Sequence, residues 1–162
     1  MTTEQPLPQR SQIVQQHLNE AGLPGRVREL PDSTRTAADA ASALGCEVGA
    51  IASSLLFLAD DEPVLVMTSG RHRVDTGQIG QQLGAASVTM APAKLVREIT
   101  GQAIGGVSPV GHPARLRTVV DEALADYEAI WAAGGTPRTV FPLTFADLVA
   151  ITGGTPIRVA DD

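Results

Sequence analysis

Hydrophobic residues recur at spacings of three and four over residues 9–21, which is the pattern of an amphipathic helix. Gly22 ends this stretch. Four further stretches begin with a capping residue or a proline and end at a glycine, as short helices do. They predict helices at residues 36–44, 75–83, 92–100 and 145–153, the last of them capped by Thr144.

Other stretches are apolar without helical spacing, which indicates β-strands. Residues 50–59 and 63–70 are both apolar and flank the acidic turn Asp60–Glu62, so they predict a β-hairpin. Residues 127–133 fit a strand or a helix, and the Gly134-Gly135 pair that follows favours a strand. Two hairpins are expected in all. Further short strands are expected at residues 26–30, 87–90, 116–124 (at its start), 138–143 and 156–160.

The predicted strands and helices are interleaved without the strict β-α-β alternation of a doubly wound sheet. We therefore expect an α+β fold, with a mixed, largely antiparallel, β-barrel-like sheet surrounded by helices. The length of 162 residues is that of one domain. We expect residues 1–162 to form a single domain in which residues 1–8 are a flexible N-terminal tail.

Composition and charge exclude several classes of protein. The net charge is −6, which argues against a large nucleic-acid footprint and against DNA binding, because phosphate contacts need Lys and Arg. The polar N-terminus and the lack of a long apolar run predict neither a signal peptide nor a membrane contact. The single cysteine, Cys46, suits a reducing compartment, and a buried apolar role fits it better than a nucleophile. We expect a cytoplasmic protein.

Residues 101–113, GQAIGGVSPVGHP, are the candidate ligand-binding segment. Glycine lets backbone groups approach a ligand and proline fixes the chain, so this loop can aim several N–H groups at one oxygen. The alternative is an ordinary rigid turn. Ser108 could offer a hydroxyl or bond its own backbone, and His112 could act as a base, donate a hydrogen bond or be a surface residue.

Other chemistry has little support in the sequence. Metal-ligand spacings, a phosphate-binding Gly-Lys loop and a Gly-x-Ser-x-Gly nucleophile motif are all absent, so we expect neither a metal nor another cofactor. Arg71 and Arg73 follow an apolar strand and could bind phosphate, or they could form a solvated patch. The only lysine, Lys94, lies in a helix of alternating charge, where a solvated role is expected.

Five stretches, taken in chain order, resemble the YbaK family, the editing domains associated with prolyl-tRNA synthetase. Together they cover nearly all of the chain after the first helix, and the Gly-Gly-Val-x-Pro loop is the most specific of them. The stretches are TAADAASALGC (36–46), GAIASSLLFLADDEPVLVMTSGRHRVD (49–75), LGAASVTMA (83–91), TGQAIGGVSPVGHP (100–113) and FPLTFADLVAITGG (141–154).

The resemblance implies an α+β fold around a mixed β-barrel and hydrolysis, in trans and without a metal, of the ester of a mischarged tRNA. It implies release of a wrong amino acid, such as alanine or cysteine, from the tRNA for proline. The loop from Gly105 to Pro109, with Gly106, Val107 and Ser108 between them, would position the aminoacyl carbonyl through its backbone. The terminal ribose hydroxyl of the tRNA would assist water. The partners implied are the acceptor end of an aminoacyl-tRNA and a synthetase.

The sequence departs from the family pattern in the first strand of the hairpin. Where the family carries Ile-x-Lys-Ser/Thr-Leu, this chain has Ile51-Ala52-Ser53-Ser54-Leu55, and Lys94 belongs to a different segment. Candidate substrate contacts are Ser53, Ser54, Arg71, Arg73, Gly111 and His112. Three functions stay open: deacylation of an aminoacyl-tRNA, with Arg71 or Arg73 supplying the charge; binding of aminoacyl-tRNA or an aminoacyl nucleotide without efficient hydrolysis; or binding of another small ligand or a protein partner.

Overall fold

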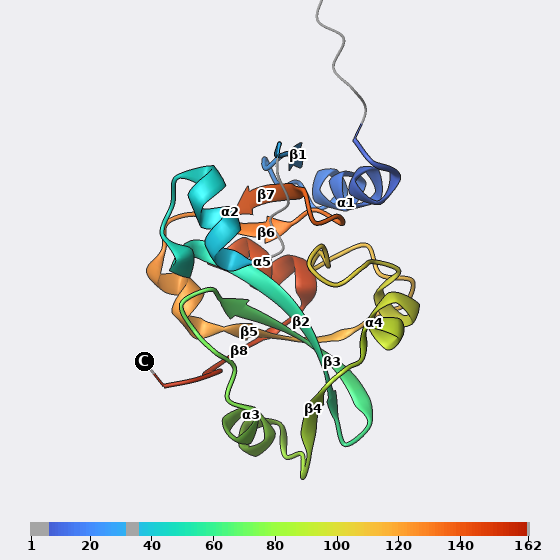
Figure 1. Ribbon diagram of the computed structural model, residues 1–162, viewed down its shortest axis with the longest axis vertical. Helices are drawn as coiled ribbons and strands as arrows, with labels where there is room; N and C mark the ends of the chain where they lie inside the picture. The colour runs from blue at the N-terminus through green and yellow to red at the C-terminus, as the bar shows by residue number, and fades with distance from the viewer. Residues whose placement is uncertain (1–6, 32–35, 162) are drawn as a thin grey trace, which may run out of the picture.

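The protein is described from a computed structural model, which describes residues 7–31 and 36–161 (Figure 1). The helices are α1 (Gln9–Glu20), α2 (Ala37–Leu44), α3 (Thr76–Leu83), α4 (Ala93–Thr100) and α5 (Phe145–Thr152), with short 3₁₀ segments η1 (Val48–Ala50) and η2 (Glu122–Asp126). The strands are β1 (Arg28–Glu29), β2 (Ile51–Ala59), β3 (Glu62–Ser69), β4 (Val88–Met90), β5 (Arg117–Asp121), β6 (Ile130–Ala133), β7 (Thr139–Leu143) and β8 (Thr155–Ile157).

These strands form one mixed sheet in the order β1-β7-β6-β2-β3-β5-β8, and β4 pairs with β2 outside this path. Among the described residues, four strand pairings are antiparallel and three are parallel. The α+β class and the mixed sheet are therefore confirmed. The expected barrel-like closure is not observed, because β1 and β8 are at opposite ends of the order and do not pair, so the sheet is open. The helices lie around it (Figure 1).

Local hydrogen bonds explain why the helices begin and end where the sequence predicts. The side chains of Thr36, Asp75 and Thr144 accept hydrogen bonds from the first backbone N–H groups of α2, α3 and α5, as helix caps do. Each of these three helices then ends at a glycine in the left-handed conformation. Both hairpins are present, and residues 130–133 of the ambiguous stretch are strand β6.

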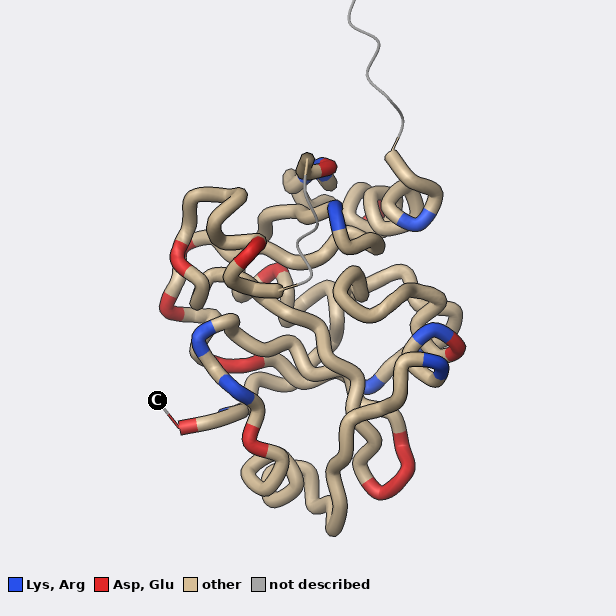
Figure 2. Tube along the Cα trace, viewed as in Figure 1, with Lys and Arg blue, Asp and Glu red and all other residues tan. Residues whose placement is uncertain are grey.

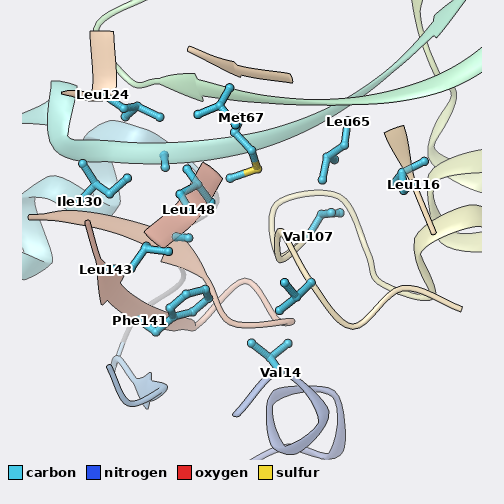
Figure 3. Packing of buried hydrophobic residues seen from close by; sticks show 14 of the residues in the cluster. Val14, Leu65, Met67, Val107, Leu116, Leu124, Ile130, Phe141, Leu143 and Leu148 are labelled. Atoms are coloured by element: carbon cyan, nitrogen blue, oxygen red, sulfur yellow. The ribbon is translucent and has the colours of Figure 1, made fainter. Parts of the chain in front are cut away.

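The core occupies both faces of strand β3 because its side chains alternate between them. Leu65 and Met67 pack in a large cluster with Val14 of α1, Phe141 of β7 and Leu148 of α5 (Figure 3). On the other face, the side chains of residues 64 and 66 pack against α3 and the end of the chain. Burial of both faces explains why β3 is almost continuously apolar.

The sequence expectation of a tail at residues 1–8 falls mostly outside the described residues, which begin at Leu7. The side chain of Leu7 packs against the large core cluster, and its carbonyl accepts a hydrogen bond from the side chain of Gln12. None of the described helices is long and apolar enough to cross a membrane.

Candidate functional site

A cavity of about 980 Å³ opens beside strand β2. On one edge β2 pairs with β3 along its length, but on the other edge it pairs only with β6 at residues 51–52 and with β4 at residues 57–59. No strand among the described residues borders Ser53–Leu55 on that edge, and the cavity lies there. Its wall includes residues of α2, β2, β6, α4 and the segment 103–107. The lining side chains are mostly small and apolar, including Ala37, Ala40, Ala52, Ala91, Ala93, Val96 and Val107.

One buried side chain holds the Gly-rich loop in shape. Gln102 Oε1 accepts a hydrogen bond from the backbone N–H of Ser108 at 2.6 Å, and Gln102 Nε2 donates to the carbonyl of Val110 at 3.2 Å. Because a backbone N–H must donate and a carbonyl must accept, these contacts fix the orientation of the amide. Gln102 is only 3% exposed, so water does not compete for either contact. The loop is therefore rigid at its centre.

The two glycines of the loop have different roles. Gly105 lines the cavity and has φ +90°, a left-handed conformation that favours glycine. Gly106 is buried against the backbone of residues 136–137, where a Cβ atom would lie 2.7 Å from the backbone nitrogen of Pro137. Val107 lines the cavity and also packs in the core cluster (Figure 3). Gly105 thus faces the cavity, while Gly106 and Val107 pack the loop against the rest of the protein.

The remaining loop candidates hold the loop rather than line the cavity. Ser108 is fully buried, and its hydroxyl accepts a hydrogen bond from the backbone N–H of Val110 at 3.2 Å, the local contact expected of a turn serine. Pro109 is buried as well. His112 Nε2 donates to the Ser108 carbonyl at 2.8 Å, and Gly111, half-buried, has φ +84°. These residues are absent from the described cavity wall.

The environment of His112 favours its neutral form. Burial lowers the pKa of the imidazole, and the nearby charge of His17 lowers it further, while the hydrogen bond to the Ser108 carbonyl raises it in part. The net direction is downward. His112 is accordingly a neutral hydrogen-bond donor at neutral pH, with its ring in contact with the loop backbone.

Both serines of strand β2 line the cavity. The Ser54 hydroxyl lies 3.0 Å from the Met67 sulfur, a weak acceptor, across the β2–β3 hairpin. Ser53 is half-buried, and no hydrogen bond of its side chain exists within the described part of the chain. The Ser53 hydroxyl is therefore the one of the two that is free to contact a ligand.

Arg71 and Arg73 do not line the cavity. Arg71 contacts Asp126 at 2.9 Å and the Tyr127 hydroxyl at 3.1 Å, and its guanidinium lies 5.7 Å from the Tyr127 ring centroid. Arg73 is exposed. Both arginines belong to the segment that joins β3 to α3, and this segment lies away from α4 (Figure 1). Phosphate binding by this pair stays a prediction.

The structure adds cavity residues that sequence reasoning did not find. Lys94 and Arg97 of α4 line the cavity together with Ser53, which corrects the expectation that Lys94 lies in the wrong segment to act there. Their spacing of three places them on one helical face, a signal that the sequence does contain. Trp131 of β6 lines the cavity too, and the Arg28 guanidinium stacks 4.5 Å from its ring centroid.

Side-chain nucleophiles and metal ligands do not gather in this site. Cys46 is half-buried beside α2, and burial raises the pKa of its thiol, which keeps the thiol protonated at neutral pH. Within residues 7–31 and 36–161, no group of three or more His, Cys, Asp or Glu side chains could hold a metal ion. The polar groups of the described wall are thus backbone, the hydroxyls of two serines and of Thr36, the indole of Trp131, two cations and Glu98.

Comparison with known proteins points to one family. The model of the aminoacyl-tRNA editing domain matches residues 31–151. A solved structure described as a "putative trans-editing enzyme for prolyl tRNA synthetase" is 42% identical, with a TM-score of 0.90, over 97% of this chain and all of the other. The protein YwhH of Bacillus subtilis (strain 168), which carries the description "uncharacterized", is 26% identical over 136 residues, 83% of this chain and 86% of that one.

The chain belongs to the aminoacyl-tRNA editing domain family, because the family model covers most of its length. A proline–tRNA ligase of Leuconostoc mesenteroides subsp. mesenteroides is 36% identical over 100 residues, 62% of this chain. That match spans only 17% of the ligase. The similarity to the ligase therefore concerns one part of a much longer protein.

Proposed function

We propose that this protein hydrolyses, in trans, the ester bond of a mischarged tRNA, for example alanyl- or cysteinyl-tRNA for proline. The observation that carries the proposal is the rigid Gly-rich loop, which presents the backbone around Gly105 to a cavity of about 980 Å³. Family membership supports it, as does the similarity to a structure described as a trans-editing enzyme.

The proposed chemistry uses the loop backbone as a set of hydrogen-bond donors to the carbonyl oxygen of the ester, which makes the carbonyl carbon a better electrophile. N–H groups near Gly105 polarise the aminoacyl carbonyl and stabilise the negative charge that develops on its oxygen. The oxygen of a water molecule forms a bond to the carbonyl carbon, and the bond to the ribose oxygen breaks. That ribose oxygen leaves as a hydroxyl after taking up a proton, and the neighbouring hydroxyl of the same ribose assists the attack. Gln102 and Gly106 act as positioning residues because they fix the loop.

The cavity wall favours an amino acid with a small uncharged side chain. Ala52, Ala91 and Val107 offer apolar contact, and an apolar wall penalises a charged group that finds no partner. Alanine and cysteine fit this description. Arg71 and Arg73, outside the cavity, are proposed to contact phosphates farther from the ester, and the protein is proposed to act beside a synthetase.

A second candidate function is binding without hydrolysis. It is favoured by Ser53, which stands where the resembling family carries a lysine, because a neutral hydroxyl stabilises charge less than a cation does. In this case the protein would bind an aminoacyl-tRNA or a related small ligand and release it unchanged.

Ester loss from a panel of mischarged tRNAs separates the two functions. The purified protein is incubated with alanyl- and cysteinyl-tRNA for proline, and with correctly charged prolyl-tRNA as the control. We expect faster loss of alanine or cysteine than in buffer, with prolyl-tRNA spared. Binding of the same tRNAs without any ester loss would establish the second function instead.

A further inference from the structure

Two cations of helix α4 lie on the cavity wall without an acidic partner. Lys94 and Arg97 are both exposed and both line the cavity. Within the described part of the chain, neither side chain forms a salt bridge or a hydrogen bond. Glu98, one turn after Lys94, is within reach of an i,i+4 pair, yet no such ion pair forms. Figure 2 shows these charges together on α4.

The position of the two cations matters because the rest of the described wall carries little charge. Among the lining residues that the structure describes, Glu98 is the only other charged side chain. The whole chain has a net charge of −6, so an unpaired Lys and Arg on one helical face form a local exception. Such a pair attracts an anion that enters the cavity, and the Arg fork suits a phosphate.

We propose that Lys94 and Arg97 bind the terminal phosphodiester of the tRNA acceptor end. The inference rests on the proposed function, which places the aminoacyl ester in this cavity beside Gly105. A nucleotide that carries its ester there also brings a phosphate to the cavity, since phosphate and ester belong to the same ribose. The two cations thereby supply from α4 the positive charge that Ser53 does not supply from β2, and they position the ester against the loop.

The first test compares the affinity of the wild type and of variants for an RNA hairpin that ends in a single-stranded CCA tail without an amino acid. The variants are Lys94→Gln, Arg97→Gln and the double variant, all at exposed positions. Arg117→Gln is the matched control, because Arg117 is an exposed arginine on the wall of a separate cavity of about 510 Å³. Thermal unfolding of each variant checks that the fold is retained.

We expect the double variant to bind the hairpin at least about tenfold more weakly at low salt, and the control to bind like the wild type. The association constant decreases with salt, so the plot of its logarithm against log salt has a negative slope. The magnitude of this slope should decrease by about 0.7 for each lost cation that contacts phosphate in a single strand, hence by about 1.4 in the double variant. An unchanged slope in the double variant, with a wild type that binds, would overturn the inference.

A second test asks whether the charge can be returned from strand β2. Ser53→Lys is introduced into the double variant, and binding and ester hydrolysis are measured again. We expect both to recover in part, whereas a merely structural role of α4 would give no recovery and would overturn the assignment.

The failures of the two proposals are distinguishable. If the double variant hydrolyses the ester as fast as an active wild type does, the proposed function stands and the role of Lys94 and Arg97 is rejected. If the double variant shows the expected change of salt slope but the wild type cleaves no ester, hydrolysis is rejected and the phosphate contact stands. A wild type that neither binds nor cleaves would reject both.

Discussion

The amide of Gln102 and the backbone N–H of Ser108 meet at 2.6 Å inside the protein, where neither residue is open to solvent. The same amide reaches the carbonyl of Val110 on its other side. One side chain thus satisfies two backbone groups of a loop that has no regular secondary structure. The shape of the cavity wall depends on this contact.

Replacing Gln102 should therefore loosen the loop. Gln102→Leu keeps the volume but leaves two buried backbone groups without a partner, at a cost of about 1–3 kcal/mol for each. We expect a lower free energy of unfolding in urea and a lower rate of ester hydrolysis at a temperature where the variant is folded. Gln16→Leu, an exposed glutamine of α1, is the control and should change neither. Equal stability of Gln102→Leu and the wild type would contradict the proposed role.

Gly105 offers a test of the backbone mechanism. In Gly105→Ala an alanine must adopt the left-handed backbone conformation, with a strain of about 1–2 kcal/mol, at a position that lines the cavity. Gly84→Ala is a matched control, because Gly84 has φ +71° and open space around its Cβ position at the end of α3. We expect a similar small loss of stability in both variants, measured by thermal unfolding. Hydrolysis should fall only in Gly105→Ala, and its persistence there would remove the loop from the mechanism.

The lowered pKa of His112 predicts a dependence of stability on pH. The unfolded chain binds a proton on His112 near the ordinary value of 6.5, whereas the folded chain binds it only at lower pH. The stability linked to His112 is therefore present above pH 6.5 and is lost as the pH falls toward the folded pKa.

Urea unfolding at pH 7.5 and at pH 5.5 measures this effect. The wild type should lose more stability between the two values than His112→Gln, whose side chain does not titrate. The comparison is made within each protein, so a general loss of stability in the variant does not affect it. An identical difference in the two proteins would show that protonation of His112 is not linked to folding.

Arg71 and Arg73 lie outside the cavity, so their predicted phosphate contact must be tested on intact tRNA. The double variant Arg71→Ala, Arg73→Ala should bind tRNA more weakly and with a smaller salt dependence than the wild type. It also breaks the exposed contact between Arg71 and Asp126, which should cost less than about 1 kcal/mol of stability. An unchanged salt slope would leave the two arginines as a solvated patch in which Arg71 contacts Asp126 and Tyr127.

Features of this protein that depend on residues close together in the sequence could be predicted from the sequence. The caps at Thr36, Asp75 and Thr144, the glycines that end those helices and the hairpin around Asp60 all rest on contacts within a few residues. The Gly-rich loop could be recognised because glycine and proline restrict the backbone locally. A capping oxygen or a fixed φ acts in the same way wherever the segment lies in the fold.

The assembly of the site was decided only by the tertiary structure. Parallel pairing of β2 with β6 and the short pairing of β2 with β4 leave one edge of Ser53–Leu55 open, and both pairings join segments far apart in the sequence. The same long-range pairings bring α4, with Lys94, to the cavity wall that contains Ser53. They also place Arg71 against Asp126 rather than in the cavity. Local preferences carry no information on such distances, because register and strand order follow from the burial of apolar faces across the whole chain.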